Sequence, residues 1–150
     1  MKFEKFLKST GSHGQILTRA NGDKWLICDG VGMKVPNGVV NLLGSGEVPE
    51  KVKDLIIGLV NADKDDKVHL TRAAVPAGGK ASDIVRVFGD ELDIEVGISN
   101  ADFGLLEKTD INLAEVEVFE SGLEYLDGKY LVVLDTDDEV IGFIHGVQSI

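Results

Sequence analysis

Hydrophobic residues along this chain recur with two different spacings, and the helical spacing marks three segments. Phe3, Phe6 and Leu7 recur with lysines between them, which predicts a short N-terminal helix. Residues 49–61 begin with a proline at the first helical position and continue with apolar residues three and four apart, as in an amphipathic helix. A shorter helix is predicted over 82–88, where a serine can cap the first turn and a glycine follows the last.

Other segments alternate between hydrophobic and polar residues, as strands with one buried face do, and the alternation is clearest over 92–98. Turn-forming residues at 21–23 and 135–138 each separate two such segments, which predicts two hairpins. Residues 29–38 are expected to form a loop or a bulged strand, because their glycines are closely spaced. Between 111 and 118 the apolar positions shift from odd to even, which predicts a β-bulge. The predicted strands are 15–20, 24–28, 39–43, 68–75, 92–98, 111–118, 130–134 and 139–145.

These elements predict an α+β fold, made mainly of antiparallel strands and hairpins with one or two short helices and a short N-terminal helix. Residues 1–14 are expected to form that helix and a flexible glycine-containing joint, and 15–150 a single α+β domain. A helix on such a joint can dock on its own domain or exchange onto a neighbouring copy, and docking at home is the favoured case. Because their apolar side chains share one face, Phe3, Phe6 and Leu7 are the candidate contacts with a protein partner.

Charge is distributed unevenly along the chain, whose net charge is −11. Residues 1–75 hold 11 Lys and Arg against 9 Asp and Glu, whereas 76–150 hold 4 against 17. An excess of thirteen negative charges in the second half disfavours direct binding of nucleic acid, since binders neutralise phosphates with Lys and Arg. The acidic half either attracts a basic partner or is a solvated surface that keeps the protein in solution.

Cysteine content and hydropathy indicate the compartment in which the chain is made. Cys28 is the single cysteine, so no disulfide within the chain and no thiolate zinc cluster is expected. The first eight residues carry charges throughout and do not resemble a secretory signal. The longest aliphatic run, 55–60, is much shorter than the ~20 residues that span a bilayer. Cytoplasmic synthesis and no membrane partner are therefore expected.

Motifs with known chemistry fail at particular positions of this sequence. Gly30 and Gly32 begin a dinucleotide fingerprint, but position 35 is a valine where a third glycine is needed. Residues 74–81 resemble a phosphate-binding loop, yet alanine occupies both the first glycine position and the Ser/Thr position that binds magnesium. Residues 135–146 offer three aspartates without the glycine and the final glutamate of a calcium loop.

Nucleophilic and histidine-based chemistry has no recognisable motif either. The three histidines, His13, His69 and His145, occur in separate predicted elements and do not form an HExxH or paired spacing. A lone cysteine in a strand, such as Cys28, is typical of a small buried hydrophobe, and no GxSxG motif occurs. We therefore assign no catalytic, cofactor-binding or metal-binding residue, and the chain is expected to work without a cofactor.

The residues from Ile98 to Lys108 and from Tyr130 to Gly146 resemble small uncharacterised virion-associated proteins of tailed phages and prophages. The resemblance covers about a third of the chain and contains no chemical motif, so it implies a class of protein and no functional residue. It implies a structural or accessory protein of the virion, such as a capsid decoration protein. The same resemblance implies association with the virion after cytoplasmic synthesis.

Three functional hypotheses follow, and they belong to different classes. The first is a non-enzymatic phage structural or accessory protein that acts through protein contacts, either with copies of itself as a homo-oligomer or with a capsid-type lattice. The second is an acidic inhibitor or nucleic-acid mimic that binds the basic groove of a host enzyme. The third is a small ligand-binding protein or enzyme whose polar groups converge only after folding. Carboxylates gathered on one face would favour the second over the first.

Overall fold

Nine antiparallel strands and three α-helices form the protein in a computed structural model, which describes residues 1–39, 48–75, 79–90 and 93–147. The strands follow the order β1-β2-β3-β9-β8-β7-β4-β5-β6 in one continuous sheet. The mainly antiparallel architecture with short helices, including one at the N-terminus, is thus confirmed. The strands are β1 (Gln15–Thr18), β2 (Lys24–Cys28), β3 (Val31–Lys34), β4 (Lys67–Ala74), β5 (Val85–Gly89), β6 (Glu95–Ser99), β7 (Leu113–Val118), β8 (Gly128–Leu134) and β9 (Val140–His145). The helices are α1 (Phe3–Thr10), α2 (Glu50–Asn61) and α3 (Asn100–Phe103), with 3-10 helices at Gly11–His13, Ala81–Asp83 and Glu124–Leu126.

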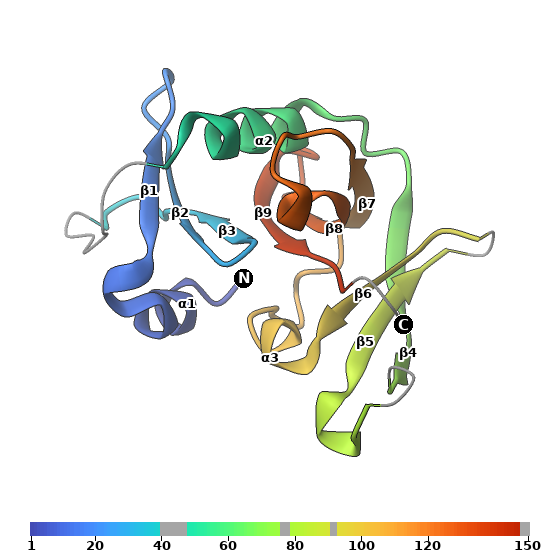
Figure 1. Ribbon diagram of the computed structural model, residues 1–150. Helices are drawn as coiled ribbons and strands as arrows, with labels where there is room; N and C mark the ends of the chain where they lie inside the picture. Colours follow the sequence, from blue (N-terminus) through green and yellow to red (C-terminus); the bar gives the residue numbers. More distant parts are fainter. Residues whose placement is uncertain (40–47, 76–78, 91–92, 148–150) are drawn as a thin grey trace.

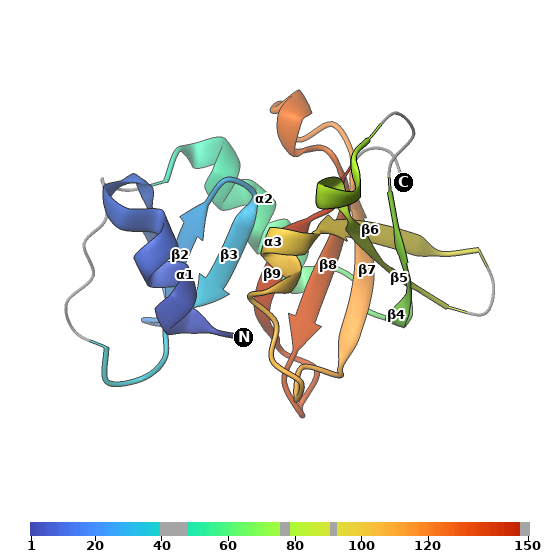
Figure 2. The same cartoon turned by 90° about the horizontal axis from the view of Figure 1, so that it is seen from below.

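The central strands are buried on both faces, because a helix or a second layer of strands covers each side (Figures 1 and 2). Helix α2 covers one face and contributes Val52, Leu55, Ile56 and Leu59 to the core there. Helix α1 and strands β5 and β6 cover the other face. Two hydrophobic cores therefore lie on opposite sides of β2, β3, β7, β8 and β9.

Strand β4 turns away from the central strands along its length. Lys67 and Val68 pair with β7, whereas His69 to Ala74 pair with β5, with a register shift between Leu70 and Arg72. Bulges of this kind bend a strand and increase its twist. The β4–β5–β6 arm consequently projects from the rest of the sheet, and most of the side chains of β4 are exposed (Figure 1).

The N-terminal helix docks on its own domain. Phe3 and Phe6 are buried in the core beneath it, and Leu7 packs partly buried against the same cluster. The backbone N–H of Lys2 donates to the Leu105 carbonyl at 2.8 Å, and Lys5 Nζ donates to the Gly104 carbonyl at 3.2 Å. The predicted joint at 11–14 contains a 3-10 helix (Gly11–His13) rather than an irregular link.

Two predicted local features are wrong. Residues 82–88 do not form a helix: a 3-10 turn ends at Asp83, and Val85 to Gly89 form β5 between β4 and β6. The β-bulge predicted over 111–118 is also wrong, because β7 pairs with β8 in continuous register from Leu113 to Val118. Ile111 precedes the strand, and both faces of β7 are buried, so apolar residues occupy odd and even positions without a shift in register.

Residues 29–38 were expected to form a loop or a bulged strand, but Val31 to Lys34 form the regular strand β3, paired with β2 without a shift in register. The strand predicted over 92–98 is β6, which begins at Glu95. The other local predictions agree with the structure where it describes them. The two hairpins are β1 with β2 and β8 with β9. The helix predicted over 49–61 is α2, with Pro49 at its N-cap. The strand predicted at 39–43 lies outside the described residues except for its first position. Within the described residues, no helix has the length and apolar character needed to cross a bilayer.

Candidate functional site

The predicted partner contacts are not on the free surface of this conformation. Phe3 and Phe6 face the chain's own core, and Leu7 is half-buried beside them. Contact between these residues and another protein would require α1 to leave its domain, and their role in partner binding stays a prediction. The structure therefore directs attention to other apolar surfaces.

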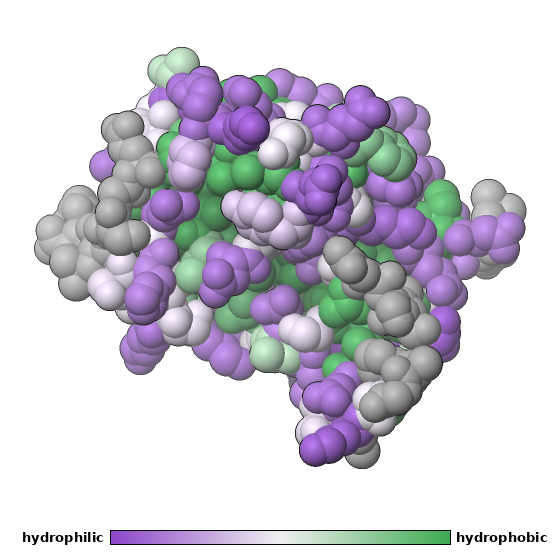
Figure 3. Space-filling view, viewed as in Figure 1, coloured by the Kyte–Doolittle hydropathy of each residue, from purple (hydrophilic) through white to green (hydrophobic). Residues whose placement is uncertain are grey.

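The single cysteine lines a small hollow beneath α2, together with other polar side chains (Figure 3). The hollow has a volume of about 200 Å³ and is lined by His13, Cys28, Asp29, Tyr130 and apolar residues of α2, among others. Ligand sites usually measure ~300–1,000 Å³, so the hollow is small for a substrate. Cys28 Sγ donates to Asp29 Oδ2 at 3.7 Å. Burial, and secondly the charge of Asp29, raise the pKa of the Cys28 thiol, so the thiol stays protonated and a poor nucleophile.

Tyr130, which is buried next to this hollow, makes its polar contact within the fold. Tyr130 Oη donates to the Leu126 carbonyl at 2.6 Å, and burial raises the pKa of its phenol. His145 Nε2 lies 3.0 Å from the Asp127 carbonyl oxygen. Both side chains thus hold the β7–β8 connection (residues 119–127) against the sheet. Within the described ranges, His, Cys, Asp and Glu side chains do not gather in a group of three suited to a metal ion.

An apolar groove lies where β4 turns away from β7, between the start of the β4–β5–β6 arm and the segment 103–113. Its volume is about 450 Å³. Leu70 and Ile111 are 45% and 80% exposed at its edges. Apolar side chains of this size on the surface mark interaction sites when they are contiguous. The lining residues are Lys2, His69, Leu70, Phe88, Phe103, Gly104, Leu106, Glu107, Lys108, Asp110, Ile111 and Leu113.

The walls of the groove are fixed by contacts within the chain. The Phe103 ring lies 6.2 Å from the ring of Phe88, and the Arg86 guanidinium carbon lies 4.9 Å from the Phe103 centroid. Glu107 donates its backbone N–H to Asp110 Oδ2 at 2.8 Å. Asn112 Nδ2 donates to the Asp135 carbonyl at 2.8 Å and to an Asp138 carboxylate oxygen at 2.6 Å. A groove that is already formed loses little conformational entropy when a partner binds to it.

The groove is lined by two lysines, Lys2 and Lys108, and by two carboxylates, Glu107 and Asp110. Asp110 is neutralised by the Met1 amino group at 2.8 Å. Among the described residues, Lys2 and Lys108 have no carboxylate within ion-pair distance, and Glu107 is the remaining acidic residue of the lining. The rim therefore has a small positive excess.

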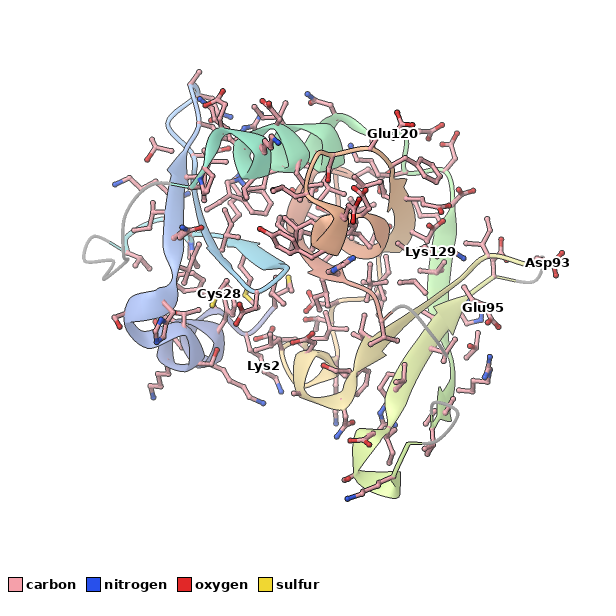
Figure 4. The ribbon with its side chains drawn as sticks, viewed as in Figure 1. Lys2, Cys28, Asp93, Glu95, Glu120 and Lys129 are labelled. Carbon is pink, nitrogen blue, oxygen red and sulfur yellow. The ribbon has the colours of Figure 1, made fainter. Side chains whose placement is uncertain are left out.

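A second exposed apolar surface occurs on the β7–β8 connection. Phe119 and Tyr125 are 71% and 68% exposed. Their sequence neighbours are acidic and include Glu117, Glu120 and Glu124. Glu120 lies beside α2 in Figure 4, whereas Lys2 of the groove rim lies in the opposite part of the view.

The carboxylates of the acidic half do not form one continuous face. They occur on the 3-10 helix at 81–83, at the β5–β6 hairpin, beside the groove, on the β7–β8 connection and at the β8–β9 turn. Figure 4 shows Asp93 and Glu95 on the β5–β6 hairpin, away from Glu120. Arg72 pairs with Glu95 at 3.2 Å and Lys67 with Asp138 at 2.8 Å, so some are neutralised locally.

Neither exposed surface was identified from the sequence. Ile111 was assigned to a strand, although its neighbours Asp110 and Asn112 are polar and a single apolar residue between them is a signal of exposure. Leu70 lies in the strand predicted over 68–75, and its exposure follows from the departure of β4 from β7. Comparison with models of protein families, with curated proteins and with solved structures finds no match to this chain.

Proposed function

We propose that this chain is a non-enzymatic protein that acts by binding other proteins, as a structural or accessory component of a phage or prophage virion. The apolar groove beside β4 carries the proposal, because Leu70 and Ile111 expose apolar surface over a preformed hollow. The resemblance of 98–108 and 130–146 to virion-associated proteins supports the virion part. The acidic-mimic alternative has less support, since the carboxylates are spread over separate segments.

The proposal is tested by quantitative mass spectrometry of virion particles purified from cells that encode the chain. The chain is expected in the particles at a fixed copy number, and the exposed-residue variant I111E is expected to be depleted from them. V75S is the matched control, because Val75 is 46% exposed and does not line the groove. A chain that is abundant in the lysate but absent from the particles would contradict the virion role.

A further inference from the structure

We propose that copies of this chain associate head to tail, with Phe119 of one copy entering the apolar groove of the next. The proposal rests on the proposed function, namely action through protein contacts, and specifies a partner for the groove. The two surfaces involved are the groove around Leu70 and Ile111 and the exposed part of the β7–β8 connection around Phe119.

The groove has the size and chemistry to receive an aromatic side chain. Its volume of about 450 Å³ is bounded by the rings of Phe88 and Phe103 and by aliphatic side chains that include Leu70 and Ile111. Offset and edge-to-face ring contacts add to the gain from burying apolar area. Burial of Phe119 would also cover the exposed side of Ile111, which now faces solvent.

Phe119 lies on a segment that contacts within the chain hold in place. It follows β7 directly, and the backbone at Glu120 has a φ of +50°, which turns the chain sharply. The Ser121 N–H donates to Asp127 Oδ1 at 3.0 Å, and Lys51 Nζ contacts the Gly122 carbonyl at 3.4 Å. The hydrogen bonds of the Ser121 side chain and backbone lower the pKa of Asp127. The contact residue is thus pre-organised, which reduces the entropic cost of association.

The excess charges around the two surfaces are opposite in sign, even though Glu107 also lines the groove and Lys51 and Lys129 also lie near Phe119. Glu117 and Glu120 flank Phe119, and Lys2 and Lys108 stand at the groove rim without an ion-pair partner among the described residues. Complementary charges at the edge of a contact steer association and fix its orientation. This complementarity favours a second copy over a basic partner for the groove, and it predicts weaker association at high salt.

The positions of the two surfaces exclude a contact within one molecule. Glu120 and Lys2 lie in opposite parts of Figure 4, and the β7–β8 connection and the segment 104–112 lie at opposite ends of Figure 2. A contact between two different patches is heterologous, and its repetition gives a ring or an open chain rather than a closed two-fold dimer. Repetition of this kind suits a component of a larger assembly.

Two variants that each remove one surface provide the test. I111E changes a residue that is 80% exposed and places a carboxylate opposite Glu117 and Glu120, while F119S removes the aromatic side chain from the other surface. Sedimentation velocity over about 1 µM to 1 mM should show growth of the unmodified chain beyond two copies as concentration rises. Each variant alone should be monomeric, and their equimolar mixture should stop at a 1:1 dimer because one intact pair of surfaces remains. V75S should behave as the unmodified chain.

Charge exchange tests the orientation of the contact. K108E should weaken association of the chain at least about tenfold, and mixing it with E120K should restore growth beyond two copies, because the mixed contacts are native in one direction and charge-exchanged in the other. The proposal is overturned if the unmodified chain is monomeric up to about 1 mM, if F119S associates as well as the unmodified chain, or if the I111E and F119S mixture remains monomeric. Particle association is measured separately. If I111E is depleted from the particles although the unmodified chain is monomeric in solution, self-association is refuted and the proposed function stands.

Discussion

The imidazole of His145 stacks on the phenol ring of Tyr130, with centroids 4.6 Å apart and 26° between the ring planes. The two residues come from adjacent strands, β8 and β9, and are register partners. Each also contacts the β7–β8 connection, Tyr130 through the Leu126 carbonyl and His145 through the Asp127 carbonyl. The pair therefore fixes the segment that presents Phe119.

Removal of the Tyr130 hydroxyl is expected to destabilise the protein. Y130F leaves the Leu126 carbonyl without its 2.6 Å donor in a buried position, which should lower the free energy of unfolding by about 1–2 kcal/mol. Urea denaturation followed by circular dichroism measures this change. The control is Y125F, which alters an exposed side chain and should change stability by less than about 0.5 kcal/mol. Equal stabilities of Y130F and the unmodified chain would show that Tyr130 is not held by this bond.

The elements that could be predicted from the sequence are those formed within one segment or between neighbouring segments. The hairpins β1–β2 and β8–β9 form between neighbouring segments joined by turn residues, and α2 follows from its apolar periodicity. The sheet order could not be predicted in this way, because pairs such as Val31 with Ile144 join residues more than a hundred positions apart. The strand β5 was missed for a related reason: the serine at 82 and the turn at 81–83 favour a helix locally, but pairing with β4 and β6 determines the result.

The candidate surfaces were harder to predict than the elements. A sequence pattern indicates which residues are apolar, and it does not indicate which of them the fold leaves uncovered. Phe3 and Phe6 looked available for a partner and are buried, whereas Phe119 and Ile111 are exposed. The difference arises from tertiary contacts, since α1 docks on the sheet and β4 leaves β7 after two pairs.

Truncation of Ile56, which packs α2 against the sheet, is expected to be strongly destabilising. Ile56 is fully buried in the core between α2 and the sheet, so I56A should cost about 2–5 kcal/mol through lost burial and the cavity left behind. I111A is the control, because the same chemical change at an 80% exposed position should cost less than about 0.5 kcal/mol. Thermal and urea denaturation measure both. Similar losses for the two variants would contradict the placement of α2 on the sheet.

Two glycine-to-alanine changes should have opposite effects. Gly58 lies inside α2, and an added Cβ would meet no atom within 4 Å, so G58A should stabilise the protein by about 0.5–1 kcal/mol. A Cβ at Gly32 would lie 2.4 Å from the ring of Phe143, so G32A should destabilise it by about 1–3 kcal/mol. Denaturant titration of both variants gives the sign of each change. A stabilising G32A would show that β3 and β9 do not approach each other as closely as the structure places them.

Glu115 is expected to make stability depend on pH. It is 7% exposed in β7, and one of its carboxylate oxygens, Oε1, has no hydrogen-bond partner among the described residues. Burial raises the pKa of Glu115 in the folded state, although Lys129 partly opposes this effect. The folded state therefore binds the proton more readily than the unfolded chain. The stability contributed by the protonated side chain is complete below the unfolded pKa and is lost as pH rises through the folded pKa.

E115Q separates this effect from the titration of the other carboxyl groups. The variant removes the charge, so its free energy of unfolding relative to the unmodified chain should rise from pH 4 to pH 7. Urea denaturation at each pH measures the difference, and E124Q, at an exposed position on the β7–β8 connection, serves as the control. The expected signature is a difference between E115Q and the unmodified chain that increases with pH, with no comparable trend for E124Q. A difference that is constant or that falls toward neutral pH would mean that Glu115 is not held in a buried, charge-disfavouring environment.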